Sequence, residues 1–189
     1  MVPCKPIPFD EQFFLALIRN RAETGFAVIP ESDQPTSSTA DPLRRELKRS
    51  GLSCVPVRGI SQRKNGGETV RYALFVLPGS WHPHWDVEPM APDLFQSELD
   101  RLCRLFRLEQ RMVFRAGRPV EFLRQTGQTE LLPFSDRCYG DLLRLWFSSV
   151  MPDDEQYLSM FLNEQPMTIS GAHRRTCCGE VIRYGLRPS

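Results

Sequence analysis

The chain has 189 residues, of which 41% are hydrophobic and 25% are charged, and this ordinary globular mixture excludes intrinsic disorder as the default state. Its 24 basic and 23 acidic residues leave a formal net charge of +1, whereas proteins that bind nucleic acid non-specifically usually carry a strong basic excess. No window approaches the roughly 20 apolar residues of a transmembrane helix, and prolines stand where a signal peptide would have its apolar run, so we expect a soluble cytoplasmic protein.

The first part of the chain predicts two helices around a short buried strand. Apolar residues four apart indicate an amphipathic helix over residues 9–21, and the apolar run Gly25–Ile29 indicates a strand. After a polar loop over residues 30–40, Asp41-Pro42 opens a second helix, which Gly51 is placed to end. The leucines of this helix are expected to face inward and its arginines outward.

The next part predicts the centre of a sheet. A strand is expected at residues 52–58, where Pro56 argues for an edge position or a bend, and a turn follows at 63–67. The run TVRYALFVL at Thr69–Leu77 is the strongest strand pattern, because its residues are mostly β-branched or aromatic. Both of its faces are apolar beyond Arg71, which predicts a central position in the sheet.

The second half of the chain predicts mainly helices. A helix over residues 93–109, capped by Asp93, has apolar residues at 4-3-4 spacing, and strands at 112–114 and 120–123 form a β-hairpin. Two further helices and a last strand are expected at residues 136–151, 154–163 and 180–185, respectively.

Together these elements predict an α+β fold, in which helices pack on a single antiparallel-rich mixed sheet and the C-terminus adds further helices. We expect residues 1–130 to form the α+β core domain. Residues 131–189 are expected to form a helical C-terminal extension that packs on this core as part of the same domain. In a reducing compartment, the six cysteines are expected to be buried thiols and not disulfides.

The loop at residues 78–92 holds the first candidate site. Alternate residues of an extended segment project to the same side, so His82 and His84 can reach one metal ion. A zinc-like ligand set would be completed from the tail, which carries His173, Cys177 and Cys178. The paired ligand spacings of structural zinc sites are absent, however, so we predict no metal and interpret the histidines as surface residues.

The same loop carries Trp81 and Trp85, and neighbouring prolines restrict their freedom. Tryptophan is among the residues that dominate interface energetics, so the loop can be a pre-ordered binding patch formed by Trp81, His82, His84 and Trp85. Tryptophan is also usually largely buried, so both rings can instead fold back as a lid over the sheet edge. The sequence leaves both interpretations open.

Arginines form a second candidate binding surface, because their side chains suit carboxylate and phosphate pairing. Arg101 and Arg104 fall on one side of the helix at 93–109, where Glu98 and Asp100 can pair with arginines at helical spacing. Since the charges balance, we interpret this row as a solvated, partly salt-bridged face in preference to a nucleic-acid footprint. The common motifs of nucleophilic catalysis and phosphate binding are absent from the sequence.

The order of elements between about residues 25 and 123 has a recognisable outline. An arginine-bearing helix ends at Gly51, a strand closes on Gly59, Glu68-Thr69-Val70 opens the central strand, and Glu109-Gln110 precedes Met112-Val113-Phe114. This outline resembles a group of small bacterial and phage α+β domains that includes the phage-encoded S-adenosylmethionine lyases and a related uncharacterised family. The resemblance implies that Glu68 and Glu109 help to hold the sulfonium cofactor and assist its cleavage.

From these patterns we expect a non-enzymatic accessory or interaction protein, of a kind that mobile elements encode, which needs no cofactor. It would bind a protein partner through the aromatic loop and the arginine-rich face, with nucleic acid disfavoured by the net charge and no membrane involved. A small-molecule enzyme of the S-adenosylmethionine lyase type is the alternative, and a zinc-stabilised domain is a second alternative.

Overall fold

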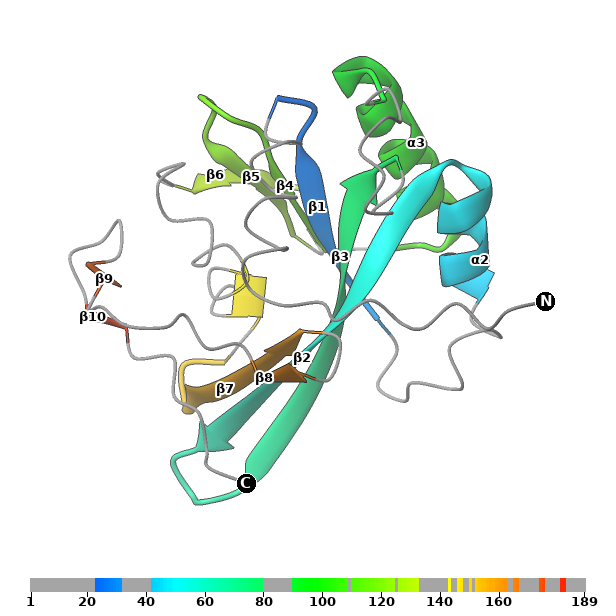
Figure 1. The fold of residues 1–189 in the computed structure, drawn as a ribbon. Coiled ribbons are helices and arrows are strands. Elements are labelled where there is room, and N and C mark those ends of the chain that lie inside the picture. Colours follow the sequence, from blue (N-terminus) through cyan, green and yellow to red (C-terminus); the bar gives the residue numbers. More distant parts are fainter. Residues whose placement is uncertain are drawn as a thin grey trace.

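The structure, a computed structural model, describes residues 23–31, 42–79, 90–108, 110–124, 126–132, 143, 146–147, 150, 152–162, 165–166, 174–175 and 181–182. Their helices and strands are drawn in Figure 1 and are, in chain order, β1 (Phe26–Pro30), α2 (Pro42–Arg49), β2 (Leu52–Arg63), β3 (Glu68–Pro78), α3 (Pro92–Leu105), β4 (Arg111–Phe114), β5 (Val120–Leu123), β6 (Thr129–Leu132), β7 (Glu155–Leu162), β8 (Gln165–Pro166), β9 (Arg174–Arg175) and β10 (Val181–Ile182). The helix predicted at residues 9–21 lies outside the described residues.

Eight of the described strands form one sheet in the order β6-β5-β4-β1-β3-β2-β7-β8, and every neighbouring pair is antiparallel. The two short strands β9 and β10 pair separately. β3 lies between β1 and β2, so the central position predicted from its two apolar faces is confirmed. The α+β class, with helices packed on an antiparallel sheet, is confirmed as well.

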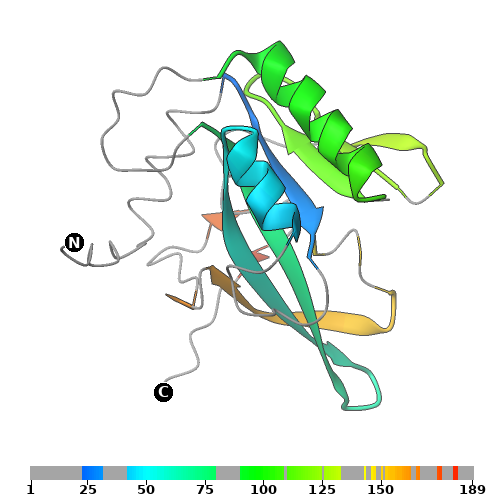
Figure 2. The same cartoon turned by 90° about the vertical axis from the view of Figure 1, so that its right-hand side faces the viewer.

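Both α2 and α3 pack on the same face of the sheet (Figures 1 and 2). The strand alternation sends Leu74 and Val76 of β3 to this face, where α2 buries its two leucines. The helix α3 adds four buried side chains, namely Phe95, Leu99, Leu102 and Cys103. Of the arginines of α2, which were expected to face outward, Arg44 is instead largely buried in an ion pair with Glu31, just after β1.

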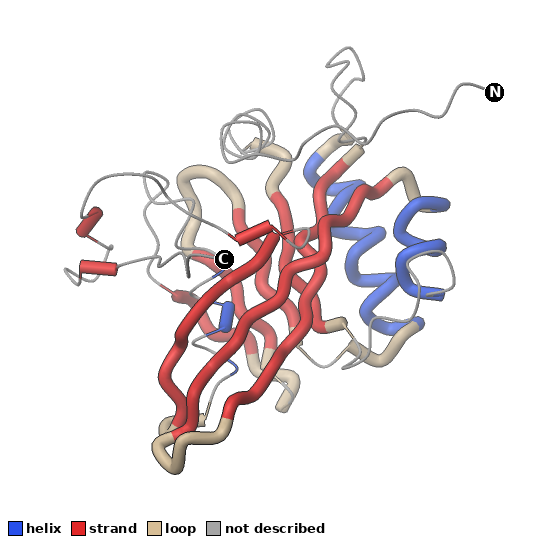
Figure 3. The backbone as a smooth tube through the Cα atoms, turned by 60° about the horizontal axis from the view of Figure 1, so that its bottom comes forward, coloured by secondary structure: helices blue, strands red, loops and turns tan. Residues whose placement is uncertain are grey.

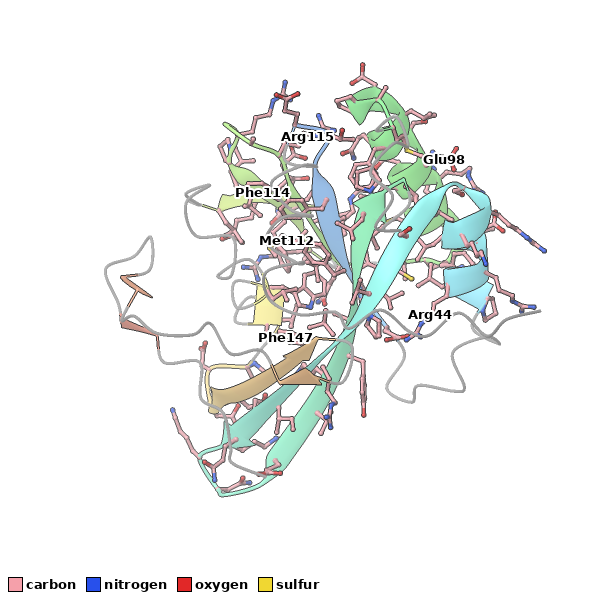
Figure 4. All side chains as sticks on the ribbon, viewed as in Figure 1. Arg44, Glu98, Met112, Phe114, Arg115 and Phe147 are labelled. Atoms are coloured by element: carbon pink, nitrogen blue, oxygen red, sulfur yellow. The ribbon has the colours of Figure 1, made fainter. Side chains whose placement is uncertain are left out.

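The opposite face of the sheet is covered from the C-terminal part of the chain. The described positions 143, 146, 147 and 150 are helical, as predicted for residues 136–151. Trp146 packs edge-on against Phe122, with ring centroids 5.8 Å apart. A Cβ atom on the buried Gly59 would lie 2.8 Å from the ring of Phe147, so the ring fits only because residue 59 is glycine. Figure 4 shows Met112, Phe114 and Phe147 on this side of the sheet and Arg44 and Glu98 on the helical side.

The helix predicted at residues 154–163 is wrong, because residues 155–162 form the strand β7. Apolar residues in this stretch fit either secondary structure, and pairing with β2 decides between them. β7 pairs with β2 from Arg63↔Glu155 to Val57↔Leu162. The last pair involves Val57, one residue from Pro56. Pro56 has no N–H to donate, and it lies just beyond the described pairing between β2 and β7. The edge strand β6 was not predicted at all.

The helix α3 is shorter than predicted and begins differently. It starts with Pro92 after Ala91, and Asp93 lies in the first turn instead of capping it. At the other end Arg107 adopts a left-handed conformation with φ 52°, and the N–H of Leu108 donates to the carbonyl of Cys103 at 2.8 Å. This closing turn ends the helix at Leu105, four residues before the predicted end. Cys103 is a buried free thiol, as expected, and burial raises its pKa.

Candidate binding site

An open pocket of about 370 Å³ lies between α2 and α3, on the outer side of the helical layer. It is lined by Glu46, Arg49, Ser50, Met90, Leu94, Glu98 and Arg101. The packing of the helices explains this set. α2 turns Leu43 and Leu47 to the sheet, which leaves residues 46, 49 and 50 on its flank. α3 buries Leu99 and Leu102, which leaves Leu94, Glu98 and Arg101 as a second flank at four- and three-residue spacing.

Arg101 is the polar centre of the pocket and joins the two helices. Its Nε donates to Glu98 at 2.9 Å, and its second terminal nitrogen donates to Glu46 at 3.1 Å and to the Ser50 hydroxyl at 2.7 Å. The hydrogen bond from Arg101 lowers the pKa of Glu98, and the same bond raises the pKa of Arg101. The predicted salt-bridged face is therefore present. Arg101, predicted as a binding residue, acts here mainly as a link between α2 and α3.

Of the two cations that line the pocket, Arg49 of α2 is the more exposed, at 77% against 41% for Arg101. Arg49 is exposed on the last turn of α2, whereas Lys48 on the same turn and Arg104 near the end of α3 are exposed but do not line the pocket. Arg49 reaches Glu46 only at 3.4 Å. Beside these charges lies an apolar part, formed by the half-buried Met90 and by Leu94, which is 52% exposed. The pocket thus combines an exposed guanidinium, that of Arg49, with an accessible apolar surface.

Apart from Arg101 and Arg104, the one predicted site residue that the structure describes is Glu68. Glu68 is exposed at the start of β3, opposite Gln62 in the hairpin, and does not line the pocket. The loop residues Trp81, His82, His84 and Trp85, the lyase-like Glu109 and the tail residues His173, Cys177 and Cys178 lie outside the described residues. The structure therefore brings Arg101 and the neighbouring Arg104 to one surface and leaves Glu68 apart from it.

A second cluster of charges lies where the long β2–β3 hairpin, prominent in Figure 3, meets β7. The carboxylate of Glu155 is fully buried. One of its oxygens accepts from Arg71 at 2.5 Å and from the Ser61 hydroxyl at 2.6 Å. The other accepts from Arg71 at 3.2 Å and from Arg63 at 3.4 Å. The hydrogen bond from Arg71 is the main cause that lowers the pKa of Glu155 to about 2.

These four hydrogen bonds fill the acceptor positions of a carboxylate. Glu155 therefore has no lone pair left to take a proton from a substrate. Its hydrogen bonds to Ser61, Arg63 and Arg71 connect β2, β3 and β7, and we call this group the structural clamp. Sequence reasoning missed this clamp because Ser61 lies 94 positions and Arg71 84 positions from Glu155. It also missed the pocket. The position of Leu94, an apolar residue outside the buried stripe of α3, could have indicated an accessible apolar surface on this helix.

Among the described residues, no group of three or more histidine, cysteine, aspartate or glutamate side chains is placed to hold a metal ion. Within the same part of the chain, no helix has the length and apolar character needed to cross a membrane. No family model, curated protein or solved structure matches this chain.

Proposed function

We propose that this protein acts by binding a partner protein on the outer surface of α2 and α3, and not by catalysing a reaction. The observation that carries the proposal is the pocket between the helices, where two arginines and two glutamates lie beside an accessible leucine and methionine. Arginine and methionine are enriched at protein interfaces, and an exposed apolar contact inside a polar rim is the usual anatomy of such a surface.

The chemistry of the pocket favours a binding surface over a reaction centre. Its central cation, Arg101, is already hydrogen-bonded to two carboxylates and a hydroxyl. A catalytic group must instead be able to gain or lose a proton near neutral pH, and the directions of the pKa shifts of Glu98 and Arg101 both favour the permanently charged forms. Nucleic acid is a poorer partner, because Glu46 and Glu98 would face its phosphates.

The proposal is tested by photo-crosslinking in the cells that naturally make the protein. p-Benzoylphenylalanine replaces Leu94 in the pocket or, as a control, Leu131 on the edge strand β6, which is 62% exposed against 52% for Leu94. We expect a discrete crosslinked product of defined mass from position 94, absent from position 131. Reversing the exposed charge of the pocket with Arg49→Glu is expected to remove that product while the melting temperature stays nearly unchanged, because the side chain is 77% exposed.

Absence of a discrete product at position 94, or equal products at positions 94 and 131, would contradict the proposed function. A product that persists after this charge reversal would show that the partner does not use Arg49.

A further inference from the structure

The side of α3 that borders the pocket carries four residues whose spacing is the same in both directions. Leu94, Glu98, Arg101 and Leu105 follow one another at four, three and four residues, so they lie on one side of the helix over about three turns. The leucines at the two ends are 52% and 58% exposed, and the two charged residues between them are half-buried. We call these four residues the α3 stripe.

The order of these residues makes the α3 stripe complementary to itself. A second α3 can lie antiparallel to the first, across a two-fold axis through the midpoint of the stripe. Leu94 then lies opposite Leu105 of the other copy, and Glu98 lies opposite Arg101 of the other copy. Each contact occurs twice, as in any isologous interface. A parallel arrangement would instead place like charges opposite each other, which is unfavourable. The stripe therefore favours the antiparallel orientation.

The charges of this surface also suit a second copy of the chain. The charged residues that line the pocket are two glutamates and two arginines, so the surface has no excess charge to attract an acidic or a basic partner. Within the described part of the chain, Arg101 donates through Nε and one terminal nitrogen, whereas a guanidinium has five N–H donors. A carboxylate has about four acceptor positions. Glu98 and Arg101 can thus keep their bond within each chain and pair again across the two-fold axis.

We propose that the chain forms a two-fold symmetric dimer in which the α3 stripes of two copies pack antiparallel. This assignment rests on the proposed function, because it names a second copy of the chain as the partner of the same surface. The exposed leucines cover one another at both ends of the contact, and the charged pairs close its centre. Three of the four stripe residues line the pocket, so the contact also covers the pockets of both copies.

Sedimentation equilibrium of the full-length chain tests for the dimer, and compensating substitutions test its register. The mass of the wild type is expected to rise with concentration from 21.8 kDa towards twice this value. Leu94→Lys and Leu105→Glu, each alone, place a charge against a leucine and are expected to weaken dimerisation about tenfold or more. The double variant brings the new lysine opposite the new glutamate of the other copy, so it is expected to dimerise about fivefold more tightly than either single variant.

The control substitution is Leu131→Lys on β6, which is expected to leave the dimer unchanged because it lies on another exposed surface. All three leucines are more than half exposed, so the melting temperatures of the variants should stay close to that of the wild type.

The outcomes separate this inference from the proposed function. A chain that is monomeric at every concentration overturns the dimer, as do single substitutions at Leu94 and Leu105 that leave dimerisation unchanged. A double variant as weak as the single ones overturns the antiparallel register and the inference with it. In each of these cases, a product from position 94 that contains a different protein keeps the proposed function. Absence of any product at that position contradicts both.

Discussion

Glu155 shows how a single side chain holds distant parts of this chain together. Its carboxylate lies between Ser61 on β2 and Arg71 on β3, and the backbone N–H of Lys64 at the hairpin end donates to the carbonyl of Asp154 beside it. A buried charge is tolerated only when it is paired and fully hydrogen-bonded, and Glu155 meets both conditions. Removing the carboxylate would leave Arg71, which is only 24% exposed, without its counter-charge.

Replacing Glu155 by glutamine is expected to destabilise the fold by about 3 kcal/mol at pH 7, measured by urea denaturation. The pKa of Glu155 is lower in the folded chain, about 2, than in an unfolded chain, so its contribution to stability is complete above pH about 4.3 and is lost as the pH falls towards 2. The stability difference between wild type and Glu155→Gln should therefore shrink in that range. A difference that stays constant from pH 7 to pH 3 would contradict the role of the charge.

At the scale of elements, the C-terminal end of α3 contains a residue whose replacement should stabilise the fold. Arg107 holds a left-handed backbone conformation, φ 52°, which costs a residue with a side chain about 1 kcal/mol more than glycine. Arg107→Gly is therefore expected to raise the free energy of unfolding by up to about 1 kcal/mol, as measured by chemical denaturation. The exposed Arg104, still within the helix, provides the opposite control, because Arg104→Gly should destabilise by a similar amount. Equal effects of the two changes would contradict this account of the helix end.

The elements that the sequence predicts correctly are those whose signals are local. The β-branched and aromatic residues of Thr69–Leu77 are enough to indicate a central strand, and Gly51 indicates where α2 ends. The secondary structure of residues 155–162 could not be predicted in this way, because their apolar spacing fits a helix as well as a strand. They form a strand because they pair with the edge of β2 that β3 does not occupy. The apolar Leu94 outside the buried stripe of α3 is a local sign of an accessible surface. Which residues lie opposite it depends on how α2 and α3 face each other, through the contact between Arg101 and Glu46, and the local sequence does not contain that information.

At the scale of the whole molecule, the sheet depends on its C-terminal cover. Gly59→Ala is expected to destabilise the protein by about 1–3 kcal/mol, since the new methyl group would lie 2.8 Å from the Phe147 ring, closer than van der Waals contact allows. Gly67→Ala is the matched control, because a Cβ at that position meets only ordinary contact, and thermal unfolding should hardly change. Combining Gly59→Ala with Phe147→Leu should cost less than the sum of the single changes. Strict additivity would show that the two positions do not contact each other.

The contact between Gly59 and Phe147 also has a consequence for biosynthesis. Synthesis proceeds from the N-terminus, so the strands β1 to β6 leave the ribosome before the residues that cover one of their faces. Helices α2 and α3 are already available to close the other face. During this interval Phe26, Phe75 and Phe114 have no cover from Leu143, Trp146 or Phe147, and the nascent chain presents an aromatic surface of the kind that chaperones protect.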